Sequence, residues 1–149
     1  MAETWDEAKL LAHGFGRVLV ELEWYDGPRV GLVDIGGLPH YFDGYGQYSG
    51  DEADEYRVWP ASPAAAELER EQWAIYVDWN ERQGTGAAYL GQGGISARYD
   101  ALDALLAQDR QAPDDARRLV GELRHTGTGH RVDGTGHWFR WRPDSRDHR

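Results

Sequence analysis

Hydrophobic and polar residues alternate with a period of two over residues 15–25, a pattern typical of a half-buried β-strand, and shorter apolar runs follow up to residue 59. Two turn signals, Asp26-Gly27-Pro28 and Gly36-Gly37, separate the apolar runs. Residues 15–25 place Val18, Val20, Leu22 and Trp24 on one face and Arg17, Leu19, Glu21 and Glu23 on the other. The shorter runs lie at residues 29–35, 38–43 and 56–59. This part of the chain therefore predicts a tight antiparallel β-meander, with a polar loop over residues 44–55.

The remaining periodicity is mostly helical. Thr4 and Glu7 form a capping-box pattern for a helix over residues 5–13, which Gly14 ends. Ser62-Pro63 is a strong helix start and predicts a helix to about residue 83, followed by a glycine-rich connection at residues 84–94. Ser96 caps a predicted helix over residues 97–109. A last helix is predicted from Pro113, because Ala116, Leu119, Val120 and Leu123 follow the spacing i, i+3, i+4, i+7.

The C-terminal residues return to strand character. Residues 130–132 and 137–142 flank the turn Asp133-Gly134-Thr135-Gly136, which predicts a β-hairpin. We therefore predict an α+β fold, in which an antiparallel meander sheet of about four to six strands carries helices on one face and ends in a β-hairpin. Residues 1–142 are expected to form a single globular domain, and residues 143–149 a polar, frayed tail.

Charge and composition restrict the classes of function. The chain has a net charge of −10. Residues 1–122 contain 23 acidic and 10 basic residues, and residues 123–149 contain 3 and 6, so the acidity lies in the body. Such a charge argues against nucleic-acid binding. The chain has no cysteine, and its longest apolar runs are far shorter than the roughly 20 residues of a membrane helix. We expect a soluble, cytoplasmic protein without a cofactor.

The predicted helix over residues 64–82 carries polar residues inside its apolar arc, namely Glu69, Gln72 and Asn80. A buried carboxylate or amide needs partners. One interpretation is structural: Glu69 pairs with an arginine of the sheet, such as Arg29 or Arg57, and Gln72 binds a backbone group. The other is a ligand pocket between helix and meander, in which Glu69 acts as a general acid or base. The residues of that pocket would be Glu69, Gln72, Trp73, Tyr76 and Trp79.

The strand at residues 38–43 offers further candidates. Leu38, His40 and Phe42 share one face, and Tyr41 and Asp43 share the other. Asp34 lies near His40 across the Gly36-Gly37 turn, so the two are a candidate base and orienting carboxylate, with Tyr41 as a ligand-binding residue. No nucleophile accompanies them. His125, His130 and His137 have spacings of five and seven, which fit no common metal motif, so no metal site is predicted.

Two functions remain open. The first is a small acidic binding module, such as an immunity or antitoxin-like protein that covers a basic protein partner. The alternative is a small-molecule enzyme or carrier, which would bind a small organic ligand in the aromatic pocket and use Glu69, Asp34 and His40 as acid and base groups. Neither function involves nucleic acid or a membrane.

Overall fold

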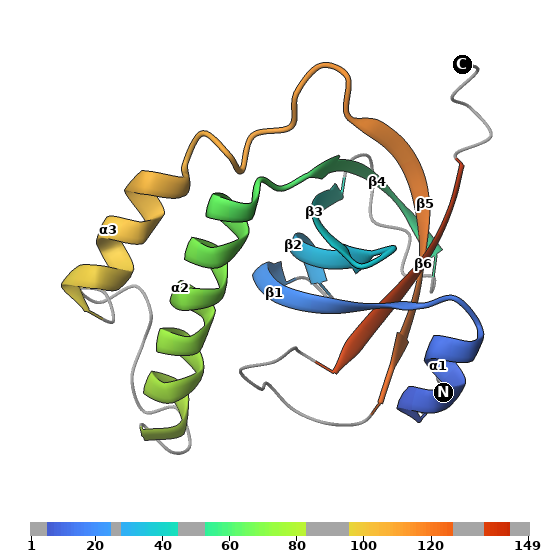
Figure 1. Ribbon diagram of the computed structural model, residues 1–149, viewed down its shortest axis with the longest axis horizontal. Helices are drawn as coiled ribbons and strands as arrows, with labels where there is room; N and C mark the ends of the chain where they lie inside the picture. Colours follow the sequence, from blue (N-terminus) through green and yellow to red (C-terminus); the bar gives the residue numbers. More distant parts are fainter. Residues whose placement is uncertain (1–5, 25–27, 45–52, 83–95, 127–135, 144–149) are drawn as a thin grey trace.

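Six antiparallel strands, each paired with the next along the chain, close into a barrel in the computed structural model of the protein (Figure 1). The structure describes residues 6–24, 28–44, 53–82, 96–126 and 136–143. Its elements are α1 (Glu7–Ala12), β1 (Gly16–Trp24), β2 (Pro28–Ile35), β3 (Leu38–Gly44), β4 (Ala53–Pro60), α2 (Pro63–Arg82), α3 (Ala97–Leu106), β5 (Arg117–His125) and β6 (His137–Pro143). None of the described helices is long and apolar enough to cross a membrane.

The predicted meander is confirmed as β1 to β4. Its tightest turn is Gly36-Gly37, where φ angles of 62° and 86° require residues without a Cβ. β4 begins at Ala53, earlier than the predicted residue 56. The predicted glycine-rich connection at residues 84–94 and the predicted strand at residues 130–132 lie outside the described residues.

Three of the four predicted helices are confirmed. Asp6 caps α1 by accepting a hydrogen bond from the Lys9 backbone N–H at 2.8 Å, whereas the predicted cap Thr4 lies outside the described residues. The helix predicted from Pro113 is wrong, because residues 117–125 form β5. Leu119 packs inside the barrel, a Cβ at Gly121 would meet the interior Phe139 ring, and Leu123 packs against the same cluster, which is the two-residue period of a strand. The helical spacing was therefore a coincidence of a few apolar residues.

Closure of the sheet corrects the predicted architecture. β6 pairs with β5 and also with β1, through Gly16 opposite Phe139 and Arg17 opposite Trp138, so the sheet is not open. The barrel has an inside and an outside rather than one core face and one solvent face. A register shift in β1 between Val18 and Val20 also breaks the predicted strict alternation. Val18 packs inside the barrel, whereas Val20 packs outside, in the cluster that includes α2 residues.

Aromatic side chains fill the inside of the barrel. Phe139 lies 5.2 Å from Phe42, 5.1 Å from Tyr56 and 4.6 Å from Trp141, measured between ring centroids. Smaller residues, including Val33, Val58 and Leu119, pack around these rings. Small barrels are commonly filled in this way, so the centre of this barrel is core and not a ligand chamber.

A second core lies outside the barrel, where α2 covers the strands. Trp73 and Val77 of α2 pack with Leu32 and Tyr41 of the barrel wall. α3 then packs on α2 through Leu102 and Leu106, so α2 lies between α3 and the barrel (Figure 1). Residues 107–116, here called the return segment, lead from α3 back to β5.

The crowded barrel interior makes a glycine of β5 sensitive to substitution. A Cβ at Gly121 would lie 2.7 Å from the Trp141 ring and 2.9 Å from the Phe139 ring. We expect Gly121→Ala to lower the free energy of unfolding by about 1–3 kcal/mol, as overpacking does, measured by urea denaturation. Gly44→Ala is the matched control, since its Cβ would meet only the end of the flexible Arg29 side chain, at 2.6 Å. An equal loss in both variants would contradict the tightly filled interior.

Candidate functional site

Glu69 is the most deeply buried charged residue among those described, and its exposed fraction is 0%. It lies on the face of α2 that meets the barrel. The Tyr41 hydroxyl, which points outward from β3, donates a hydrogen bond to Glu69 Oε2 at 2.7 Å. A carboxylate in this position needs a cation to offset the loss of hydration.

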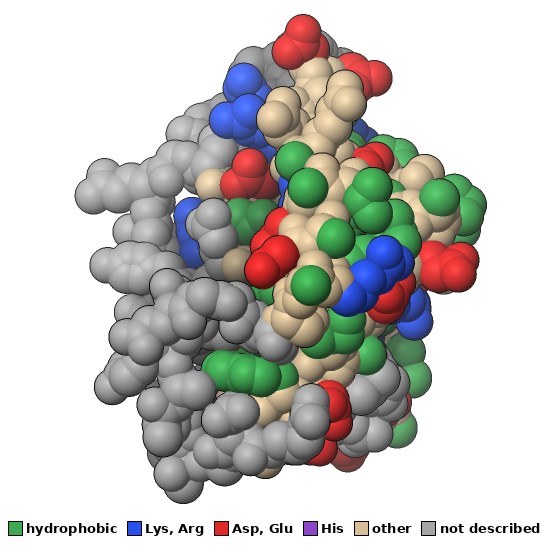
Figure 2. Space-filling model, turned by 90° about the vertical axis from the view of Figure 1, so that its left-hand side faces the viewer, with side chains coloured by type: hydrophobic (Ala, Val, Ile, Leu, Met, Phe, Trp, Pro, Cys, Tyr) green, Lys and Arg blue, Asp and Glu red, His purple; other side chains and the backbone are tan. Residues whose placement is uncertain are grey.

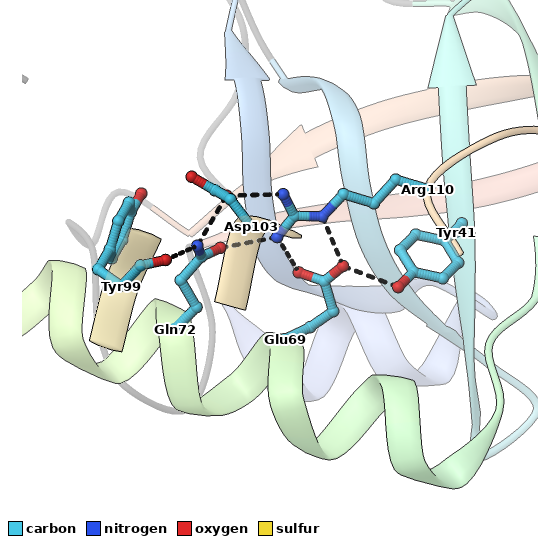
Figure 3. A network of polar contacts seen from close by, with 6 residues as sticks. All are labelled: Tyr41, Glu69, Gln72, Tyr99, Asp103 and Arg110. Atoms are coloured by element: carbon cyan, nitrogen blue, oxygen red, sulfur yellow. Dashed lines mark hydrogen bonds and ion pairs between the residues drawn. The ribbon is translucent and has the colours of Figure 1, made fainter. Parts of the chain in front are cut away.

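Arg110 of the return segment supplies that cation. Its Nε donates to Glu69 Oε2 at 2.9 Å and its Nη2 donates to Glu69 Oε1 at 2.8 Å, which is a two-pronged arginine–carboxylate pair (Figure 3). The Arg110 side chain is 19% exposed. The pair joins α2 to a segment 41 residues away in the sequence.

Gln72, one turn further along α2, extends the network to α3. Its Oε1 accepts from Arg110 Nη2 at 2.7 Å, and its Nε2 donates to Asp103 Oδ1 at 2.8 Å and to the Tyr99 carbonyl oxygen at 3.0 Å. Arg110 Nη1 also donates to Asp103 Oδ1, at 2.9 Å. Figure 3 shows Tyr41 and Arg110 converging on Glu69 while Asp103 and Tyr99 converge on Gln72.

The pKa values of Tyr41 and Arg110 are both raised in the network. Burial raises the pKa of the Tyr41 hydroxyl, and the hydrogen bond to the Glu69 carboxylate raises it further, so Tyr41 stays a donor. Burial acts to lower the pKa of the Arg110 guanidinium, but the Glu69 and Asp103 carboxylates outweigh it and the net shift is upward. The guanidinium is therefore a permanent cation.

These contacts agree with the structural interpretation of the polar helix positions. Glu69 does pair with an arginine, but the partner is Arg110 and not Arg29 or Arg57. Gln72 binds a backbone group, as that interpretation expects. Both carboxylate oxygens of Glu69 accept hydrogen bonds from strong donors, so neither is available as a base for a substrate proton.

The aromatic candidates of α2 pack with one another and with the barrel. Trp73 is buried in the outer core, and its ring stacks on Tyr76 with 5.3 Å between centroids. Tyr76 in turn lies 6.4 Å from Trp79. Asn80 is half-buried on the last turns of the same helix.

Asp34 and His40 do not face each other. The register places Asp34 opposite Pro39 and His40 opposite Val33, so the two residues alternate in direction along their strands. His40 shares the inward direction of Val33 and Phe42, and its Nδ1 lies 2.9 Å from the Leu38 carbonyl oxygen. The predicted pair of base and orienting carboxylate is therefore wrong in its geometry.

Both residues nevertheless lie at the same end of the barrel, where two cavities flank Ile35 and Trp141. Asp34 lines one cavity, of about 550 Å³, and His40 lines the other, of about 510 Å³. Glu69 lines neither. The sequence candidates thus fall into two groups: Glu69, Gln72 and Tyr41 in the network, and Asp34 and His40 at the barrel end.

Two members of the network, Asp103 and Arg110, were missed in the sequence. A signal exists, because Asp103, Leu106 and Arg110 recur at i, i+3 and i+7 on the face that α3 turns toward α2. The Arg110 backbone N–H donates to the Leu106 carbonyl oxygen at 3.1 Å, so the helical direction continues for one turn past α3. That continuation carries the guanidinium to Glu69.

Metal ligation is not indicated in the described part of the chain. No group of three His, Asp or Glu side chains there is arranged to hold an ion. His125 and His137 lie 6.4 Å apart between ring centroids, and His130 is not among the described residues.

Comparison with known proteins gives no functional assignment. The chain matches no family model, no curated protein and no solved structure. The function is therefore argued from the geometry of this chain.

Removal of the Glu69 charge tests the role of the network. Glu69→Gln leaves the Arg110 guanidinium largely buried without its carboxylate. We expect the free energy of unfolding to fall by about 3 kcal/mol. This value is at the lower end of the range for a broken buried ion pair, because Arg110 is partly exposed to solvent. Tyr41→Phe removes a single hydrogen bond and should cost about 1–2 kcal/mol. Urea denaturation measures both, and a Glu69→Gln variant as stable as the wild type would refute the structural role.

Proposed function

We propose that the protein is a protein-binding module of immunity or antitoxin type, which covers a basic partner protein with the outward face of α3. The observation that carries this proposal is an exposed apolar stripe on α3, next to carboxylates that form no ion pair within the part of the chain that the structure describes. Leu105 is 57% exposed, and Ala101 and Ala104 of the same face are exposed as well. These positions follow the spacing i, i+3, i+4 of one helix face.

The stripe lies on the side of α3 that does not contact α2. Leu102 and Leu106 already provide the apolar face that α3 needs for packing. A second apolar face on a short helix has no role in holding α3 on α2. Exposed apolar groups with polar surroundings are typical of protein-binding surfaces.

Exposed acidic side chains lie on α3 and along the return segment that follows it. Asp100 lies on α3, and Asp109, Asp114 and Asp115 lie on the return segment; all four are exposed and form no ion pair among the described residues. Over residues 97–116 the two basic residues are Arg98, which binds Glu71, and Arg110, which binds Glu69. Figure 2 shows this side of the molecule, with hydrophobic and acidic side chains next to one another.

This arrangement favours a basic partner on two grounds. Among the described residues, no cation has to be released from the four carboxylates before they bind a partner's lysine or arginine. Their field also speeds the encounter with a positively charged protein. The network of Glu69 and Arg110 supports the same proposal, because it holds α3 and the return segment in place before binding, and preorganisation lowers the entropic cost of association.

Site-specific photo-crosslinking tests the surface directly. The protein with a photo-reactive amino acid in place of Leu105, expressed in the cells of the native host, should crosslink to a basic protein. The crosslink should weaken when Asp100→Asn and Asp109→Asn are added, and it should fade in high salt. Leu38 is the matched control, since it is exposed to 65% at the β2–β3 turn, away from α3. Failure of Leu105 to crosslink, or the same products at both positions, would contradict the proposed surface.

A further inference from the structure

The cavity beside His40 lies at the end of the barrel, where β4 ends, β5 begins and the return segment approaches them. Its volume is about 510 Å³, within the range of about 300–1,000 Å³ that small-molecule sites occupy. Its apolar walls include Ile35, Pro60, Pro113 and Pro143, none of which is fully buried. The proline rings fix the backbone φ angle, so this rim is rigid.

Three basic side chains from three different strands line this cavity, and solvent reaches all of them. They are His40, which is half-buried, and Arg117 and Arg142, which are exposed. His40 of β3 lies opposite Pro60 of β4, and Arg117 of β5 lies opposite Val58 of the same strand. Directly opposite residues share a face of the sheet, and Val58 packs inside the barrel, so Arg117 extends from the inward face at the barrel end.

The two arginines of the cavity are available to an incoming anion. Arg124 and Arg140 of the same two strands both bind Glu122, whereas Arg117 and Arg142 form no ion pair with any residue that the structure describes. Among these residues, an anion therefore has no carboxylate to displace. β5 and β6 together contain five arginines and one acidic residue, so this side of the acidic protein is locally positive.

The His40 imidazole has one nitrogen left for a ligand. Its Nδ1 lies 2.9 Å from the Leu38 carbonyl oxygen, and since a carbonyl oxygen only accepts, Nδ1 carries a hydrogen and donates it. Nε2 is therefore the available nitrogen. Neutral Nε2 accepts a hydrogen bond from a P–O–H group, and protonated Nε2 donates one to a phosphate oxygen. Phosphate monoesters exchange that proton near neutral pH, because their second pKa is about 6.

We infer that this cavity binds a small phosphate monoester. The phosphate accepts hydrogen bonds from Arg117 and Arg142 and binds His40 Nε2 through one proton, and the organic part packs against Ile35 and the prolines of the rim. A phosphate monoester has three terminal oxygens and a charge of about −1.5 to −2, which suits two guanidinium groups. A carboxylate has two oxygens and one charge, which a single guanidinium matches. The inference goes beyond the proposed protein-binding function, because it involves the barrel end rather than the outward face of α3.

Calorimetric titration of the purified protein with phenyl phosphate and with benzoate tests the site. Phenyl phosphate should bind, and benzoate, which carries the same ring on a carboxylate, should bind more weakly. Arg117→Gln and Arg142→Gln should each weaken the binding of phenyl phosphate about fivefold to tenfold, as the loss of one charge-assisted contact at a solvated site does. Asp115→Asn should strengthen it, because Asp115 lines the cavity and repels an anion. Arg118→Gln, an equal change of charge at the next residue of β5, which does not line the cavity, should bind like the wild type.

Thermal unfolding without ligand separates a binding role from a structural one. Arg117 and Arg142 are exposed, so both variants should unfold at the wild-type temperature. Absence of phenyl phosphate binding, equal affinity for benzoate, or an equal loss in Arg117→Gln and Arg118→Gln would overturn the inference. If an arginine variant unfolds at a lower temperature, NMR of the wild-type protein decides the result: phenyl phosphate should shift the backbone amide signals of His40 and Ile35, and unchanged signals there would overturn the inference.

Discussion

The position of both long helices depends on the buried ion pair of Glu69 and Arg110. The pair joins α2, the return segment and, through Tyr41, the barrel wall. Gln72 and Asp103 extend it to α3. Because burial of one charge without the other is costly, the two segments hold each other in place more specifically than apolar packing alone would. An apolar seam tolerates sliding, whereas a two-pronged arginine–carboxylate pair admits one geometry.

The local pattern of hydrophobic and polar residues predicted much of this fold. The parts that it did not predict depend on pairing between strands that are far apart in the sequence. The alternation in β1 and the turn at Gly36-Gly37 identified the meander, and Ser62-Pro63 identified the start of α2. Closure of the barrel depends on the contact of β6 with β1, whose residues lie more than a hundred positions apart, and no local period reports it. Four apolar residues near Leu119 also fit a helix as well as a strand, and the pairing of β5 with β4 and β6 decided between them.

The residues of the candidate site divide in the same way, into those that a local pattern identified and those that only long-range contacts place. Glu69 and Gln72 were identifiable because they interrupt an apolar arc, which is a local property of one helix. Their partner Arg110 was missed, because its helical spacing from Asp103 and Leu106 does not by itself indicate that its side chain reaches Glu69. Asp34 and His40 were assigned to one pair because they are close in the hairpin, but a shift of one residue in register reverses the direction of a side chain. The functional surface proposed for a basic protein partner, the outward face of α3, lies outside the network.

Hydrogen exchange measured by mass spectrometry on Arg110→Met tests most directly whether this ion pair holds the helices on the barrel. Methionine keeps much of the apolar stem of Arg110 but removes the cation. We predict faster exchange at the backbone amides of α3 and α2, with unchanged protection in β5 and β6, because the apolar side chains of these two strands pack inside the barrel and not against α2. Unchanged exchange at α3, or an equal loss of protection in the barrel strands, would contradict the account.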